Sequence, residues 1–335
     1  MIFHPILRWL AGLRKQTIIL PAAGALISLF AAGCATTESP PSAQVDAAAQ
    51  RTQTVKLQIF LDANHFGPGV IDGRPGEFTA KALARYNASR GLPPGTQPDV
   101  SAIEPLQIYK ISADDVRRIG SQADELAAIE KQKNQPYTSM SELVAERFHT
   151  TQNFLAKINP GLNINTLQPG DSVIVPNVEH PFQIEDLPGS KTITRKTPLA
   201  ARRVTINLGA RMLEVRENNG TLIAAFPITP GSTEHPAPPG EWRIVGIATF
   251  PWFRWDDGVL ERGERTDTFY NLPPGPNSPV GILWAGLNKP GIGIHGTSNP
   301  DTIGRAGSHG CIRLANWDAA VFRTLVSAGS SVTIL

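Results

Sequence analysis

Near the C-terminus the chain reads Gly293-Ile294-His295-Gly296-Thr297 and then Ser308-His309-Gly310-Cys311-Ile312-Arg313-Leu314. These two segments bring one cysteine close in sequence to two histidines. A thiol is a weak nucleophile at its ordinary pKa of about 8.5, and an imidazole can take its proton or stabilise the thiolate. The glycines permit a tight loop that aims backbone N–H groups at an oxyanion. The segments therefore predict thiolate catalysis.

Cysteine usage supports a chemical role for Cys311. The chain has two cysteines, Cys34 and Cys311. They are not a closely spaced set, so a disulfide framework is not expected. A lone cysteine is usually a buried small hydrophobe, but the neighbours here are Ser, His, Gly and Arg. A zinc site built from His295, His309 and Cys311 would need a fourth ligand, and a redox thiol would need a resolving partner. The sequence offers neither, so nucleophilic catalysis is the preferred interpretation.

From about Arg203 to Leu335 the chain resembles the L,D-transpeptidase catalytic domain of the YkuD or ErfK/YbiS type. The resemblance implies a mainly β catalytic domain with short helices, and an acyltransferase with a cysteine nucleophile that needs no metal or organic cofactor. The segments that carry it are Pro239-Gly240-Glu241-Trp242-Arg243-Ile244, Asn271-Leu272-Pro273-Pro274-Gly275-Pro276-Asn277, the His295 segment, Ile303-Gly304-Arg305 and the Cys311 segment.

The resemblance also implies roles for single residues. Cys311 is the nucleophile, and His295 is its proton partner, oriented by the backbone carbonyl of Gly296. His309, with the N–H groups of Gly310 and Cys311, lines the oxyanion site.

Three further residues are expected at the substrate. Arg313 orders the loop or helps hold a substrate carboxylate through its planar guanidinium. Ser308 and Thr297 are expected to contact the substrate. The implied reaction is attack on the third residue of a peptidoglycan tetrapeptide stem, with release of D-alanine and formation of a thioester. An amine acceptor then gives a 3-3 cross-link or an attached outer-membrane lipoprotein, whereas water makes the same site a carboxypeptidase or hydrolase.

The N-terminus predicts export. A positive segment precedes the apolar run Thr17 to Ala32, which is short and contains Pro21, as in a secretory signal. It ends in Phe30-Ala31-Ala32-Gly33-Cys34, which resembles the lipobox of bacterial lipoproteins. Lipid on Cys34 would anchor the chain in the outer membrane of a Gram-negative bacterium, facing the periplasm. Because Ala31 stands where leucine is commonest, cleavage by the ordinary signal peptidase stays open.

Length and charge indicate a multidomain exported body. The chain has 335 residues and a net charge of +2, without the dense basic block that nucleic-acid binding needs. We expect a signal peptide at 1–33, a disordered tether at 34–53, a helical module at 54–97, a linking segment at 98–135, a LysM-like module at 136–178, a linker at 179–201 and the catalytic domain at 202–335.

The two modules are expected to hold peptidoglycan. The first resembles peptidoglycan-binding domain 1 in its Asp72-Gly73 turn, in Thr79, and in the Ala-rich helix that follows. The second resembles LysM, a two-helix, two-strand unit that grips glycan, through Asn159-Pro160-Gly161-Leu162 and the turn and strand of 167–176. Its first strand is degenerate. A purely structural role is the alternative for both modules, and a non-catalytic peptidoglycan-binding lipoprotein is the alternative for the whole chain.

Alternating apolar residues predict the strands of the catalytic domain. They lie near 204–208, 212–215, 222–226, 242–245 and 331–335, with one late helix from Trp317 to Ser327 capped by Asn316. Residues 116–119 and 123–131 are expected to be helical. Trp252, Phe253 and Trp255 are expected in a loop, as core or lid packing.

Overall fold

The computed structural model describes residues 41–189, 192–193, 196–305 and 310–335. Expectations about Cys34, Ser308 and His309 therefore lie outside the described residues. From Ser42 to Leu335 the chain forms one compact unit. No helix in the described ranges is long and apolar enough to cross a membrane. The N-terminal elements are α1 Pro41–Ala63, α2 Glu77–Ser89, β1 Leu106–Lys110, α3 Ala113–Arg117, α4 Leu126–Ile129, α5 Met140–Arg147, α6 Gln152–Ile158, η1 Ile164–Thr166, β2 Ser172–Pro176 and η2 Ile184–Asp186.

Most of the expected tether is helical. We expected disorder over 34–53, but α1 begins at Pro41, so the expectation is wrong for 41–53. The C-terminal half of α1 buries Val55, Ile59 and Leu61. A helix fixed at one end propagates cheaply through the Ala- and Gln-rich residues before it. A segment poor in apolar residues can therefore be helical without a core of its own.

The helix pair α1 and α2 packs on one edge of the catalytic sheet. Leu61, Phe66 and Leu83 share an apolar cluster with Met212 and Leu222 of the catalytic region. Phe66 also forms a parallel β-bridge with Ala225, which covers part of an edge strand. The pair thus contributes to the stability of the catalytic fold.

β1 lies in the expected linking segment, 98–135, and pairs with a strand of the segment expected to be LysM-like. β1 pairs antiparallel with β2 over the whole length of both strands, from Leu106 opposite Pro176 to Lys110 opposite Ser172. The expected degenerate first strand is thus absent just before α5, and β1 takes the place beside β2. The apolar pattern did not show β1 because it buries little, and Ile108 is 73% exposed. The helix expected at 116–119 begins three residues earlier, as α3, and the helix expected at 123–131 is the shorter α4.

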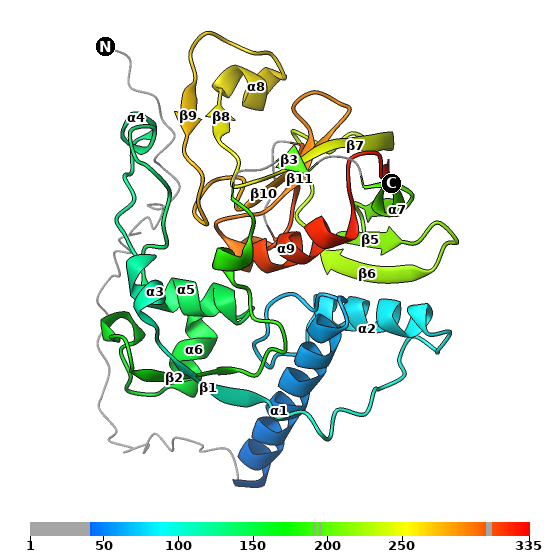
Figure 1. Ribbon diagram of the computed structural model, residues 1–335. Coiled ribbons are helices and arrows are strands. Elements are labelled where there is room, and N and C mark those ends of the chain that lie inside the picture. Colours follow the sequence, from blue (N-terminus) through cyan, green and yellow to red (C-terminus); the bar gives the residue numbers. More distant parts are fainter. Residues whose placement is uncertain (1–40, 190–191, 194–195, 306–309) are drawn as a thin grey trace, which may run out of the picture. The chain divides into compact units, whose positions relative to one another are not determined.

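Among the described residues, nine strands form one sheet in the order β12-β11-β10-β7-β13-β4-β5-β6, with β3 paired to β7 (Figure 1). The last strand, β13, is inserted between β4, parallel, and β7, antiparallel. The elements of this region are β3 Thr192–Ile193, α7 Thr197–Ala200, β4 Arg203–Asn207, β5 Met212–Arg216, β6 Leu222–Pro227, β7 Gly240–Thr249, β8 Phe253–Trp255, α8 Asp257–Arg262, β9 Tyr270–Leu272, β10 Leu283–Leu287, β11 Gly293–His295, η3 Pro300–Thr302, β12 Ile312–Arg313, α9 Asn316–Leu325 and β13 Ser331–Ile334.

The five expected strands of the catalytic domain are present as β4, β5, β6, β7 and β13. Two details differ from expectation. Ala315, not Asn316, is the N-cap of α9, no side chain caps the helix, and the helix ends at Leu325. Phe253 and Trp255 lie in β8, which pairs with β9, and Trp252 is 59% exposed, so the expected loop is a two-stranded arm.

Candidate active site

Strand register places Cys311 and His295 on one face of the sheet. β11 and β12 pair in parallel, with Ile294 opposite Ile312 and His295 opposite Arg313. Side chains of paired residues point to the same face, and the face repeats every second residue. Cys311 therefore lies level with Gly293 and shares a face with His295 and Arg313. Gly293 has no side chain, and the ring of Trp284 lies 2.7 Å from the position that a Cβ would take there.

The imidazole of His295 is held in one tautomer. Its Nδ1 lies 2.6 Å from the carbonyl oxygen of Gly296, and a carbonyl only accepts, so Nδ1 carries the proton. Nε2 then holds the lone pair that can take a proton. The ring stacks on Trp284, with centroids 5.5 Å apart and planes at 17°. The expected orienting contact with Gly296 is thus present, and Trp284 adds a second constraint.

Burial favours the neutral forms of His295 and Cys311. It lowers the pKa of His295 to about 4, although the Gly296 contact acts in the opposite direction, and the charge of Arg313 lowers it further. Burial likewise raises the pKa of the Cys311 thiol, while a hydrogen bond with Gly293 and the charge of Arg313 partly offset the change. The Cys311 Sγ lies 3.4 Å from the carbonyl oxygen of Gly291. The resting pair at neutral pH is therefore thiol and imidazole, not thiolate and imidazolium.

The other expected site residues differ in their surroundings. Gly310 has φ +95°, a backbone conformation that favours glycine, next to Cys311. Arg313 lies within electrostatic reach of both His295 and Cys311. Thr297 is buried, and its hydroxyl accepts a hydrogen bond from the N–H of Asn299 at 3.2 Å. In this structure that side chain holds the turn after the catalytic strand.

Sequence reasoning missed Asn316 as a support of the site. Its side chain is fully buried, and its Oδ1 accepts from the N–H of Ile282 at 3.2 Å. A Cβ on Gly296 would lie 2.2 Å from that oxygen, so the amide packs directly on the peptide that orients His295. Its Nδ2 donates to Glu146 Oε1 at 2.8 Å. The only signal in the sequence was a polar residue at the start of an apolar helix, which we took for a cap.

The catalytic region is similar to known L,D-transpeptidases. The family model described as "YkuD: L,D-transpeptidase catalytic domain" matches residues 201–334. A Bacillus licheniformis protein assigned as an L,D-transpeptidase, YkuD, is 31% identical over 193 residues, which cover 58% of this chain and 92% of that protein. Its Bacillus subtilis counterpart is 28% identical over 191 residues, 57% of this chain and 90% of that protein.

Among solved structures, L,D-transpeptidase 3 from Mycobacterium tuberculosis is 17% identical, with coverage of 50% of this chain and 76% of that chain and a TM-score of 0.33. A likeness this limited adds nothing to the sequence matches. Those matches, with the cysteine and histidine on one sheet face, define an L,D-transpeptidase type of enzyme. The chain belongs to the YkuD family of L,D-transpeptidases.

Proposed function

We propose that this protein is a peptidoglycan L,D-transpeptidase that works through a Cys311 thioester. The observation that supports the proposal is the pairing of β11 with β12: continued by one residue, it sets Cys311 level with Gly293, on the sheet face of His295. The Nδ1 of that imidazole is occupied by the Gly296 carbonyl. That contact leaves Nε2 as the base. Membership of the YkuD family supports the same reaction type.

The neutral resting pair sets the order of proton transfers. Cys311 attacks the carbonyl of the third stem residue while His295 Nε2 takes the thiol proton. The backbone N–H groups of Gly310 and Cys311 stabilise the oxyanion, with His309. Collapse of the adduct breaks the amide bond, and His295 returns the proton to the amine of D-alanine. The product is an acyl-enzyme with free D-alanine.

The second half of the reaction regenerates the thiol. An acceptor amine attacks the thioester carbonyl, its proton passes to His295, and the Cys311 sulfur leaves as the thiol. A wall amine gives a 3-3 cross-link, and a lysine of an outer-membrane lipoprotein gives attachment to the wall. Water in place of the amine gives carboxypeptidase or lipoprotein-releasing activity. We favour the amine, in line with the transpeptidase family.

The proposal extends to location. Lipid on Cys34 would hold the enzyme at the outer membrane on the periplasmic side. The LysM-like region would grip glycan. The match with the Bacillus licheniformis protein supports a shared architecture, because 193 aligned residues exceed the stretch 201–334 and so include part of the preceding region. Detergent-phase partitioning that persists in Cys34→Ser would contradict lipidation.

The reaction is tested by giving the protein a disaccharide tetrapeptide and analysing the products by mass. The proposal expects free D-alanine and a cross-linked dimer, both lost in Cys311→Ala. Free tripeptide without dimer would assign water as the acceptor. A correctly folded wild-type protein that releases no D-alanine would refute the thioester mechanism.

A further inference from the structure

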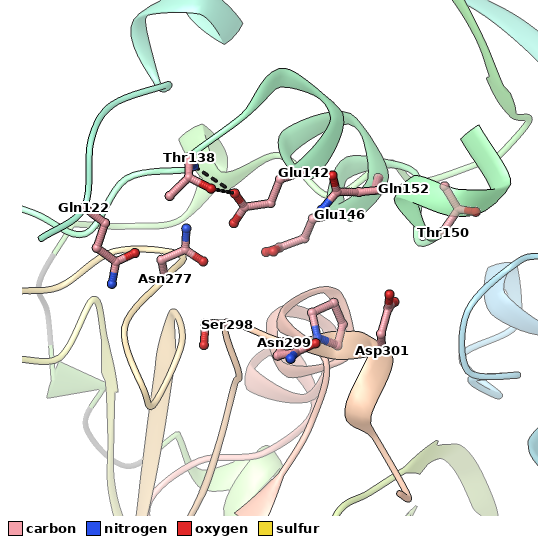
Figure 2. Close-up of a pocket in the computed structure, with 12 residues that line it drawn as sticks. Gln122, Thr138, Glu142, Glu146, Thr150, Gln152, Asn277, Ser298, Asn299 and Asp301 are labelled. Atoms are coloured by element: carbon pink, nitrogen blue, oxygen red, sulfur yellow. Dashed lines mark hydrogen bonds between the residues drawn. The ribbon is translucent and has the colours of Figure 1, made fainter. Parts of the chain in front are cut away.

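A cavity of about 420 Å³ lies apart from the cysteine, between α5 and the segment that follows the catalytic strand β11. Figure 2 shows Glu142 and Glu146 on one side, with Asn277, Ser298 and Asp301 across the space. The volume falls within the range of small-molecule sites, roughly 300–1,000 Å³. The remaining lining residues are Gln122, Thr138, Ala145, Thr150, Gln152, Asn299 and Pro300.

Within the described residues, only one of the two oxygens of the Glu146 carboxyl accepts hydrogen bonds. The residue is 4% exposed, and its Oε1 accepts from the Tyr137 hydroxyl at 3.3 Å and from Asn316 Nδ2 at 2.8 Å. Among the described residues nothing donates to Oε2, and the side chain lines the cavity. Oε2 is not among the fully enclosed side-chain atoms that lack a partner, so it opens to the cavity, where a ligand or water can donate to it. The cavity thus contains an acceptor suited to a donor from outside.

The charge of the lining has one sign. Among the described residues that line the cavity, Glu142, Glu146 and Asp301 carry carboxyls and none carries a basic side chain. Glu142 Oε2 is occupied by the backbone N–H and hydroxyl of Thr138, at 2.8 and 2.6 Å. The rest of the wall is mainly amide and hydroxyl groups, which accept hydrogen bonds from an ammonium at modest cost.

We propose that this cavity binds a primary ammonium group on a polar chain, with Glu146 Oε2 as its anchor. An ammonium brings three donors, matching the carboxylate and the neutral acceptors around it. Given the proposed function, on which this identification rests, the ligand is the free side-chain amine of a diamino acid in a wall stem peptide. The cavity is then a holding site for a second stem, separate from the reacting thiol.

The raised pKa of Glu146 is a further reason to expect a cationic ligand. Burial raises the pKa of Glu146 to about 8 in the empty cavity, although hydrogen bonds from Asn316 and Tyr137 act in the opposite direction. The titratable groups that face it are Glu142 and Tyr137 and, across the cavity, Asp301. An ammonium stabilises the ionised form, so binding expels the proton. Affinity should rise between pH 6 and 8, where the ligand amine stays charged.

The test is calorimetric titration of the full chain with the tripeptide N-acetyl-alanyl-γ-glutamyl-lysine, whose only amine is on the lysine side chain, and with its Nε-acetyl form. Neither peptide contains the amide bond to a terminal D-alanine that Cys311 would cleave, so no thioester can form. We expect acetylation to weaken binding by about tenfold or more, the range of a charge-assisted hydrogen bond. Glu146→Gln should weaken binding of the free amine by a similar factor and abolish the difference between the two peptides. Affinity of the wild type should increase roughly tenfold or more from pH 6 to 8.

Glu179→Gln is the matched control, because that side chain is 66% exposed and outside the cavity, and it should bind like the wild type. If Glu146→Gln melts early, Glu142→Gln in the same cavity serves instead, with an expected loss of several-fold. Equal binding of both peptides by the wild type would overturn the proposal. Tight binding of a neutral N-acetylated glycan, unaffected by Glu146→Gln, would assign the cavity to sugar and also overturn it. Release of D-alanine is measured separately, so failure of this inference and failure of the proposed function are distinguishable.

Discussion

Replacing Glu146 by Gln should stabilise the empty protein at alkaline pH and leave its stability at pH 5 nearly unchanged. Burial raises the pKa of this carboxyl to about 8, from 4.5 in an exposed chain. Between these values the folded protein keeps the proton and the unfolded chain releases it. Each rise of one pH unit in this window therefore destabilises the wild-type fold by about 1.4 kcal/mol. The glutamine cannot ionise and escapes this loss.

The size of the effect follows from the same window. Summed from pH 4.5 to 8, the loss in the free energy of unfolding of the wild type is at most about 5 kcal/mol. Glu146 lines a cavity and is not enclosed in a dry core, which reduces this value, so we expect roughly 2–3 kcal/mol, or about 5–10 °C in Tm for a unit of this size. Gln Oε1 can still accept from Tyr137 and Asn316, and its amide can donate into the cavity, so shape and contacts are kept.

The assay is thermal unfolding of the wild type, Glu146→Gln and the exposed control Glu179→Gln between pH 5 and 9. His295 also titrates, but its lowered pKa costs stability as pH falls from 6.5 towards 4 and does so in all three proteins. The difference between Glu146→Gln and the wild type isolates the glutamate. A difference that stays constant, or shrinks as pH rises, would refute the reasoning.

Three other outcomes are expected. Cys311→Ala should abolish D-alanine release with little change in Tm, and a carbapenem should add its mass to the wild type only; an adduct on the variant would contradict the site. The acid limb of kcat/KM should lie near pH 4, because only neutral His295 accepts the thiol proton and burial keeps it neutral above that pH; a limb centred at 6.5 would show that the imidazole is solvated. Asn316→Ala should lower kcat and cost about 3 kcal/mol, or about 6–12 °C in Tm, since it leaves the Ile282 N–H and the Glu146 carboxyl short of partners; unchanged kcat would show that the Gly296 peptide needs no such support.

The strands of the catalytic domain were predictable because each buries one face. Val204 and Ile206 of β4 are buried between more exposed neighbours, and the alternation is visible in the sequence. β1 gave no such signal, because its residues are exposed or half-buried along its whole length. Its position depends on the ladder with β2, more than sixty residues away, and local pattern carries no information about that pairing.

The residues of the candidate site and the cavity were likewise predictable only in part. Cys311 and His295 were predictable because their residue types and spacing are chemical signals in themselves. Glu146 and Asn316 were not, because their meaning arises from a contact across 170 residues. In the sequence, Glu146 is an ordinary helix glutamate, and such residues are usually solvated. Tyr137, Asn316 and the walls of the cavity bury it instead.

Burying a glutamate costs stability, because its side chain is usually solvated. A glutamine at this position could make the same hydrogen bonds, so the fold gains no stability from the carboxyl itself. Such conflicts between local preference and surroundings concentrate at functional sites. His295 and Cys311 show the same conflict, since burial moves both pKa values away from their ordinary ranges. The parallel favours a ligand as the partner that the Glu146 carboxylate lacks. The amide that bonds this glutamate also packs on the peptide that orients His295. Under the proposed function, a stem held in the cavity and the proposed base then share one buried support.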